Sequence, residues 1–180
     1  MIGRRRPSRP ILLLGTLAVV AGGALLLERT RPGRSTEPPV LGVAAADVVA
    51  VRVEEAGRRL WAVRERDGWR VEQPAAARAG AGEAVADLVN AIVAMVALDS
   101  FRRPGLDRRT LGLEPPRARI EVTLSDRGAP IVVALGDLTP SGGSVYGAVD
   151  GDPRVFRIGA LIASEIENAL YRVWPPEALH

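Results

Sequence analysis

Hydrophobic and polar residues alternate in several short segments of the chain, with the period of two that a half-buried β-strand requires. The first segment, residues 48–54, places Val49, Val51 and Val53 on one face. Further strands are predicted at 60–66 and at 69–73, separated by an Asp-Gly turn. Residues 48–73 therefore predict three antiparallel strands.

A helical period replaces the alternation between Glu83 and Leu98. Apolar residues recur there at spacings of three and four, the pattern of an amphipathic helix: Val85, Leu88, Val89, Ile92 and Val96. The second half of this segment has no polar side chain, so we expect the helix to end buried against the apolar face of a sheet.

The segment TLGLEPPRARIEVTLSD, residues 110–126, combines a corner with a strand. Gly112 supplies a flexible corner, Leu113 follows it, and Pro115 begins a Pro-Pro pair that cannot continue a helix. An alternating strand then points Ile120, Val122 and Leu124 inward, and Arg119, Glu121 and Thr123 outward. The motif is interpreted as structural, because it contains no nucleophile, base or metal ligand.

Three more strands and a helix complete the pattern. The strands are predicted at 131–135, at 144–149 with Tyr146, and at 154–158, and the loop from Gly136 to Ser144 joins the first two. An amphipathic helix is predicted at 159–172. The order is three strands, a helix, four strands and a helix, which predicts an α+β domain with mainly antiparallel pairing over residues 41–173.

An uncharged run of 17 residues, Ile11 to Leu27, precedes this domain. As a helix it would span about 25 Å, near the lower limit for crossing a hydrocarbon core of about 30 Å. Arg9 and Arg29 flank the run and can extend toward the two interfaces. We predict a transmembrane anchor at 11–27, a basic tail at 1–10, a linker at 28–40 and a C-terminal tail at 174–180.

The distribution of arginine favours a cytoplasmic N-terminus and an exported domain. Four arginines precede the apolar run and three follow it, where Glu28 and Glu37 partly offset them. A cleavable signal peptide is the alternative, since small residues occur at 21–24, but the apolar run continues beyond them to Leu27. Both interpretations place the domain outside the cytoplasm, either periplasmic or extracellular.

The positive net charge of +3 belongs to the N-terminal segment. Residues 1–37 hold seven Arg and two Glu, whereas residues 38–180 hold 17 Arg and 19 acidic residues. A nucleic-acid partner is therefore not expected, because such a surface needs basic residues gathered on the folded part.

The residue inventory excludes several kinds of chemistry. The chain has no cysteine and no lysine, which excludes thiolate sites, Walker-type phosphate loops and Schiff bases. His180, the only histidine, is the last residue and is poorly placed to act as a base. Asp150 and Asp152 could suggest calcium, but Asp-Gly between two strands is ordinary turn chemistry. No catalytic, cofactor-binding or metal-binding residue is predicted.

Three tryptophans and one loop are the candidate contact sites. Trp69 is expected to pack against the helix that follows it, while Trp61 would be a partner contact if its face of the sheet is exposed. Trp174 beside two prolines could be an interfacial or docking element. The loop at 136–144, with Asp137, could instead hold a small envelope ligand such as a glycan or peptide beside Tyr146.

The ordered motifs resemble a bacterial family, the domain of unknown function 4340. The resemblance covers roughly residues 48–173 and rests on DGWRVEQP (67–74), the following helix, LGLEPPRARIEVTLSD (111–126), ALGDLTPSGGSVYGAVDGD (134–152), the Val155 strand and the last helix. Two features depart from the family pattern: Gly82 stands as the expected helix cap where an Asp is frequent, and the unit occurs once.

The resemblance implies a membrane-anchored extracytoplasmic protein, and some family members occur alongside ABC-type transport components and gliding-associated proteins. It carries over no reaction and no catalytic residue. We therefore expect a non-enzymatic interaction or accessory subunit of a transport or envelope complex. A binding module for a small ligand is the alternative.

Overall fold

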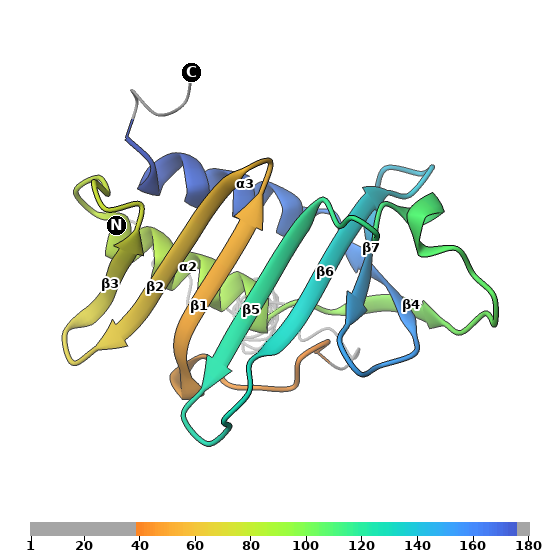
Figure 1. The fold of residues 1–180 in the computed structure, drawn as a ribbon, viewed down its shortest axis with the longest axis horizontal. Coiled ribbons are helices and arrows are strands. Elements are labelled where there is room, and N and C mark those ends of the chain that lie inside the picture. Colours follow the sequence, from red (N-terminus) through yellow and green to blue (C-terminus); the bar gives the residue numbers. More distant parts are fainter. Residues whose placement is uncertain (1–38, 176–180) are drawn as a thin grey trace, which may run out of the picture. The chain divides into compact units, whose positions relative to one another are not determined.

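The computed structural model describes residues 39–175, which form one eight-stranded antiparallel sheet with two α-helices (Figure 1). The strand order is β3-β2-β1-β5-β6-β7-β8-β4. The strands are β1 (Val48–Glu55), β2 (Arg58–Glu65), β3 (Gly68–Gln73), β4 (Ala97–Phe101), β5 (Ala118–Leu124), β6 (Ile131–Leu138), β7 (Ser144–Val149) and β8 (Val155–Gly159). The predicted α+β class and antiparallel pairing are confirmed.

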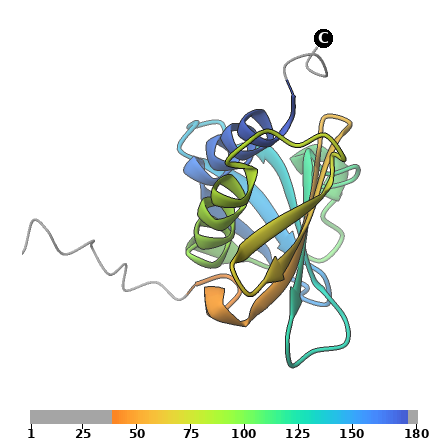
Figure 2. The same cartoon turned by 90° about the vertical axis from the view of Figure 1, so that its left-hand side faces the viewer.

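Helices α2 (Ala81–Val93) and α3 (Leu161–Val173) lie on the same face of the sheet (Figure 2). Their apolar sides and the inward-pointing residues of the strands form the main core, in which Leu88, Ile120 and Ile166 are at most 1% exposed. We call this covered side the inner face and the opposite side the outer face.

The period-two pattern correctly predicts which residues of β5 point inward. Ile120, Val122 and Leu124 are buried, and Val122 pairs with Val51 of β1. On β1 the prediction is wrong at one position, because Val48 is fully buried whereas Val49 is only partly so. The ladder between β1 and β5 shifts its register between Val48 and Ala50, and this irregularity exchanges the two valines.

The predicted helix at 83–98 is too long, because the helix stops five residues earlier and residues 97–98 already belong to a strand. Helix α2 ends at Val93, and Ala97–Phe101 forms β4, which pairs antiparallel with β8 at the edge of the sheet. Apolar residues continue from Ala91 to Leu98 without interruption, so periodicity alone cannot separate a buried helix from a strand here. Pairing with the otherwise open edge of β8 favours a strand over a longer helix for residues 97–101.

The N-terminus of α2 also differs from the prediction. Gly80, with a φ of 79°, is the N-cap, whereas Gly82 lies inside the first turn. A Cβ at Gly82 would lie 2.7 Å from the carbonyl oxygen of Trp69. Glycine at this position therefore allows the helix to approach strand β3 closely.

The described part of the domain begins at Pro39 and is attached to the core from its first residues. Val40 donates its backbone N–H to the Met95 carbonyl at 2.8 Å, and Pro39 forms a bridge with Val96. Arg64 holds the next turn, η1 (Ala45–Asp47), by donating to the Val48 and Ala45 carbonyls, both at 2.7 Å. The end of the predicted linker is thus part of the folded domain.

The other N-terminal predictions, and the end of the C-terminal tail, lie outside the described residues. These are the tail at 1–10, the apolar run at 11–27, the linker up to residue 38, and residues 176–180 with His180. Among the helices of residues 39–175, none has the length and hydrophobicity needed to span a bilayer.

Candidate functional site

The outer face of the sheet divides into two halves with different surroundings. Over β6, β7, β8 and β4 the chain covers itself with the segment at 102–117, which contains the short helix η2 (Arg108–Leu111). Over β3, β2, β1 and β5 neither α-helix covers the outer face, because both lie on the inner face (Figures 1 and 2). We call these the covered half and the open half.

The covered half is closed by a small second core. Leu113 is 3% exposed and is buried together with Ala148 and Val155, with Tyr146 packed against them. Leu113 of the predicted motif therefore packs over this half of the sheet. Pro115 and Pro116 follow as the chain turns into β5.

Two glycines of the predicted motif meet in this covered half. A Cβ at Gly136 of β6 would overlap the Leu111 carbonyl oxygen, and a Cβ at Gly112 would lie 2.5 Å from the Asp137 carboxyl carbon. Gly112 also has a φ of 66°, which side chains disfavour. The structure thus brings together Gly112, Leu113, Gly136 and Tyr146 by close packing. Trp69, which lies in the earlier DGWRVEQP segment, instead packs against the main core on the inner face.

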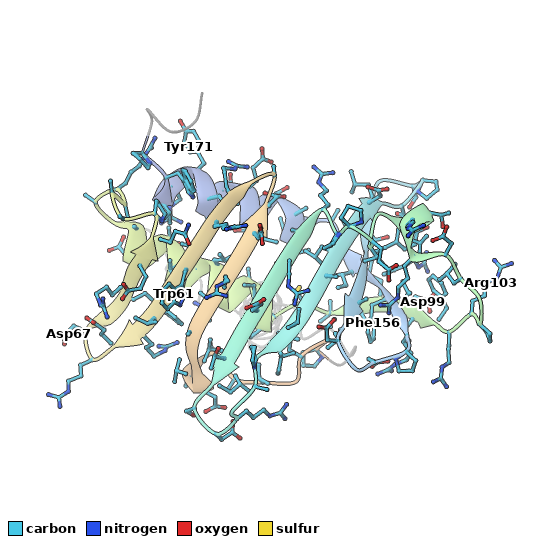
Figure 3. The ribbon with its side chains drawn as sticks, in the orientation of Figure 1. Trp61, Asp67, Asp99, Arg103, Phe156 and Tyr171 are labelled. Carbon is cyan, nitrogen blue, oxygen red and sulfur yellow. The ribbon has the colours of Figure 1, made fainter. Side chains whose placement is uncertain are left out.

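Trp61 is the large hydrophobic residue of the open half. It lies on β2, points to the outer face opposite Arg52, and is 39% exposed (Figure 3). The Arg52 guanidinium lies 5.5 Å from the centroid of the indole ring, a cation–π distance. Trp61 therefore lies on an exposed face, the condition under which the sequence predicts a partner contact.

Charged residues of both signs surround Trp61. Arg52 pairs with Glu121 at 3.5 Å, Arg119 donates to Glu121 at 3.2 Å, and Arg59 donates to Glu54 at 3.0 Å. Such exposed pairs contribute roughly 0–1 kcal/mol each. A partner with charges of its own can therefore replace them at little cost.

A shallow hollow lies beside the indole. Its volume is about 220 Å³, and its lining includes Arg52, Trp61, Glu121, Thr123 and Pro130. The outward positions of β5 that the sequence predicts, Glu121 and Thr123, form one wall of it. The arrangement offers an aromatic anchor, a hollow and exchangeable ion pairs on one face.

The loop after Gly136, the candidate small-ligand site beside Tyr146, is closed by its own hydrogen bonds. Strand β6 continues to Leu138, and Thr139 Oγ1 donates to the Ser144 carbonyl at 3.1 Å and lies 3.0 Å from Ser144 Oγ. These polar groups stabilise the turn itself. Leu138 and Gly142 instead line a cleft near Glu55.

In the turn at residues 150–152, Asp152 forms an ion pair with Arg154. The Asp152 carboxylate accepts hydrogen bonds from the backbone N–H and the guanidinium of Arg154, which lower the pKa of Asp152 to about 2. The adjoining cleft of about 690 Å³ is lined by Arg102 and residues 150–154. Within residues 39–175 no group of three or more His, Cys, Asp or Glu side chains is arranged to hold a metal ion.

Comparison of the chain with protein-family models, with curated proteins and with solved structures finds no match. The resemblance described above therefore depends on the quoted motifs alone. The sequence identifies Trp61 as a candidate contact, and the structure adds its exposure and its charged neighbours.

Proposed function

We propose that this chain is a membrane-anchored, extracytoplasmic, non-enzymatic interaction subunit, and that the open half of its sheet is the surface that contacts another protein. The observation that carries the proposal is the exposed Trp61, with Arg52 beside it, on a half of the sheet that neither α-helix covers. Tryptophan and arginine are among the residue types that most often dominate the energy of protein interfaces.

The surroundings of Trp61 support a protein partner over a nucleic acid. Arg52, Arg59 and Arg119 each have an acidic neighbour, so the open half has no continuous basic surface for a phosphate backbone. A flat, mixed-charge surface with one aromatic anchor suits a partner that presents an apolar recess and ionic groups at its rim.

The membrane anchor is proposed from the uncharged run at 11–27, and the positive-inside bias favours an exported domain. Together with the family resemblance, an exported domain supports a partner protein within a transport or envelope complex, and ABC-type transport components are the candidate partners.

Resistance of the chain to alkaline extraction from membranes tests the anchor. An intact mass near 19.1 kDa distinguishes it from a cleaved signal peptide.

Photo-crosslinking in native membranes tests the contact surface. A photoreactive amino acid replaces Trp61 in the full-length chain, and the matched control replaces Tyr171, which is 58% exposed on α3. We expect one defined membrane protein to be captured from position 61 and not from 171. Capture from neither position, or the same products from both, would contradict the proposal.

A further inference from the structure

A cleft of about 560 Å³ lies away from the open half, where the β1–β2 turn and the start of β5 face helix α3. Its volume is within the range of small-molecule sites, about 300–1,000 Å³. Charged residues of the lining come from the two sides of the β1–β2 turn, from the residue before β5 and from α3, and Leu138 at the end of β6 and Ser164 of α3 also line it: Glu55, Arg58, Arg117, Leu138, Ser164 and Glu167.

Glu55 is the unusual member of this lining, because it is a carboxylate in a core position. It follows Val51 and Val53 on the inward-pointing side of β1, and the residue is 8% exposed. Its Oε2 atom is buried and has no hydrogen-bond partner, and the nearest guanidinium nitrogen, on Arg58, is 3.7 Å away. Burial raises the pKa of Glu55, although Arg58 and Arg117 oppose the effect.

A buried carboxylate oxygen without a donor is costly, so the lining contains an acceptor that a ligand could satisfy. Glu167 supplies a second carboxylate from α3, one turn after Ser164. Arg58 and Arg117 supply two guanidinium groups from the sheet side. The four charged side chains therefore balance, with carboxylates and guanidiniums lining the same small space.

We propose that this cleft binds a small zwitterion, a molecule that carries both an ammonium and a carboxylate group, such as a free amino acid or a short peptide. The ammonium donates to Glu55 and Glu167, and the carboxylate accepts from Arg58 and Arg117. An anion alone would leave the Glu55 oxygen without a donor, and a cation alone would leave the guanidiniums without an acceptor. The proposal is independent of the contact role of the open half.

Calorimetric titration of the purified full-length chain tests the site with matched probes. The probes are the free amino acids and simple dipeptides, the same compounds with an acetylated amine, the same compounds with an amidated carboxylate, and a neutral disaccharide. We expect at least one zwitterion to bind, and loss of either charge to weaken it by about tenfold or more, the effect of one charge-assisted hydrogen bond.

Three variants connect the binding to these residues. Glu55→Gln and Arg117→Gln should each weaken zwitterion binding about tenfold or more. Glu54→Gln, the neighbour on the outer face, is the control and should leave binding unchanged. Arg117 is exposed, so its replacement provides a second test that does not alter a core position. Absence of zwitterion binding, equal binding of a blocked probe, preference for the disaccharide, or unchanged affinity in the Arg117 variant would overturn the proposal.

Discussion

The two halves of the outer face differ in what covers them, although they belong to one continuous sheet. Over β6, β7, β8 and β4, Leu113 and its neighbours form a second core, and the segment carrying them is held against β6 at Gly136. Over the other strands the same face displays Trp61 among exposed ion pairs. The segment at 102–117, between β4 and β5, thus covers one half of the outer face, and the other half is left exposed.

This difference separates residues that serve stability from residues that serve contact. Covering requires small residues where two backbone segments approach, and apolar residues beneath them. A contact surface requires an exposed aromatic and polar groups that can exchange partners. Substitutions on the two halves should therefore differ in kind, with losses of stability on one and losses of association on the other.

The largest expected effect comes from Gly136→Ala. The added methyl group would overlap the Leu111 carbonyl oxygen, so the covering segment must move away from β6. We expect the free energy of unfolding to fall by about 2–3 kcal/mol, the upper part of the usual cost of overpacking because the overlap is with backbone, in chemical denaturation of the purified full-length chain.

Gly128→Ala is the matched control for this substitution. A Cβ at Gly128 would meet no atom within 4 Å, so its stability should change by less than about 0.5 kcal/mol. Equal effects at the two glycines would show that the contact between Leu111 and Gly136 does not hold the covered half closed.

A pair of truncations compares the two halves directly. Leu113→Ala should cost about 2 kcal/mol, because it empties the second core. Trp61→Ala removes more atoms but should cost only about 1 kcal/mol, since the indole is partly exposed and loses chiefly its contact with Arg52. Denaturation curves for both variants measure these costs. A greater loss for Trp61→Ala would mean that the indole serves mainly the fold.

A stabilising substitution should be available at the turn between β1 and β2. Ala56 has a φ of 49°, a left-handed conformation that side chains other than Asn, Asp and Gly seldom adopt. Ala56→Asn should raise the stability by about 0.5–1 kcal/mol, because Asn-Gly suits this two-residue hairpin turn. Combined with Trp61→Ala, it restores stability without restoring the indole, which separates lost association from lost folding. A fall in stability would show that Ala56 is needed at this position for its contacts.

The pH dependence of stability should report the buried carboxylate. Because burial raises the pKa of Glu55 above its ordinary value of 4.5, the folded chain binds this proton more tightly than the unfolded chain. Ionisation of Glu55 therefore lowers the stability as pH rises from 4.5 through the raised pKa. Glu55→Gln should be more stable than the parent chain at pH 7, and the difference should shrink below pH 4.5. A difference independent of pH would contradict this assignment.

Much of the sheet could be predicted from sequence because its strands are half buried. Alternation identifies the inward residues of β5 and the outward set that includes Arg119 and Glu121, and an Asp-Gly turn separates β2 from β3. Strand β4 could not be predicted, because an apolar run without Gly or Pro gives no sign of where helix α2 ends. The edge of β8 that pairs with it is distant in sequence.

The candidate sites depend on tertiary information to a greater degree. Sequence parity places Trp61 and Val63 on one face, but only the arrangement of α2 and α3 determines which face is exposed. Glu55 lies two residues after Val53 in the same alternating pattern, so its inward direction could have been inferred from the sequence. Its approach to Arg117 and Glu167 could not, since these residues come from separate elements.

Oxidative footprinting of the full-length chain tests the contact role of the open half most directly. Hydroxyl radicals modify exposed aromatic side chains, and Tyr171 on α3 provides an internal reference. We predict that Trp61 is oxidised several-fold more slowly, relative to Tyr171, in native membranes than after purification in detergent. An unchanged ratio of Trp61 to Tyr171 oxidation would mean that no partner covers the open half in the membrane.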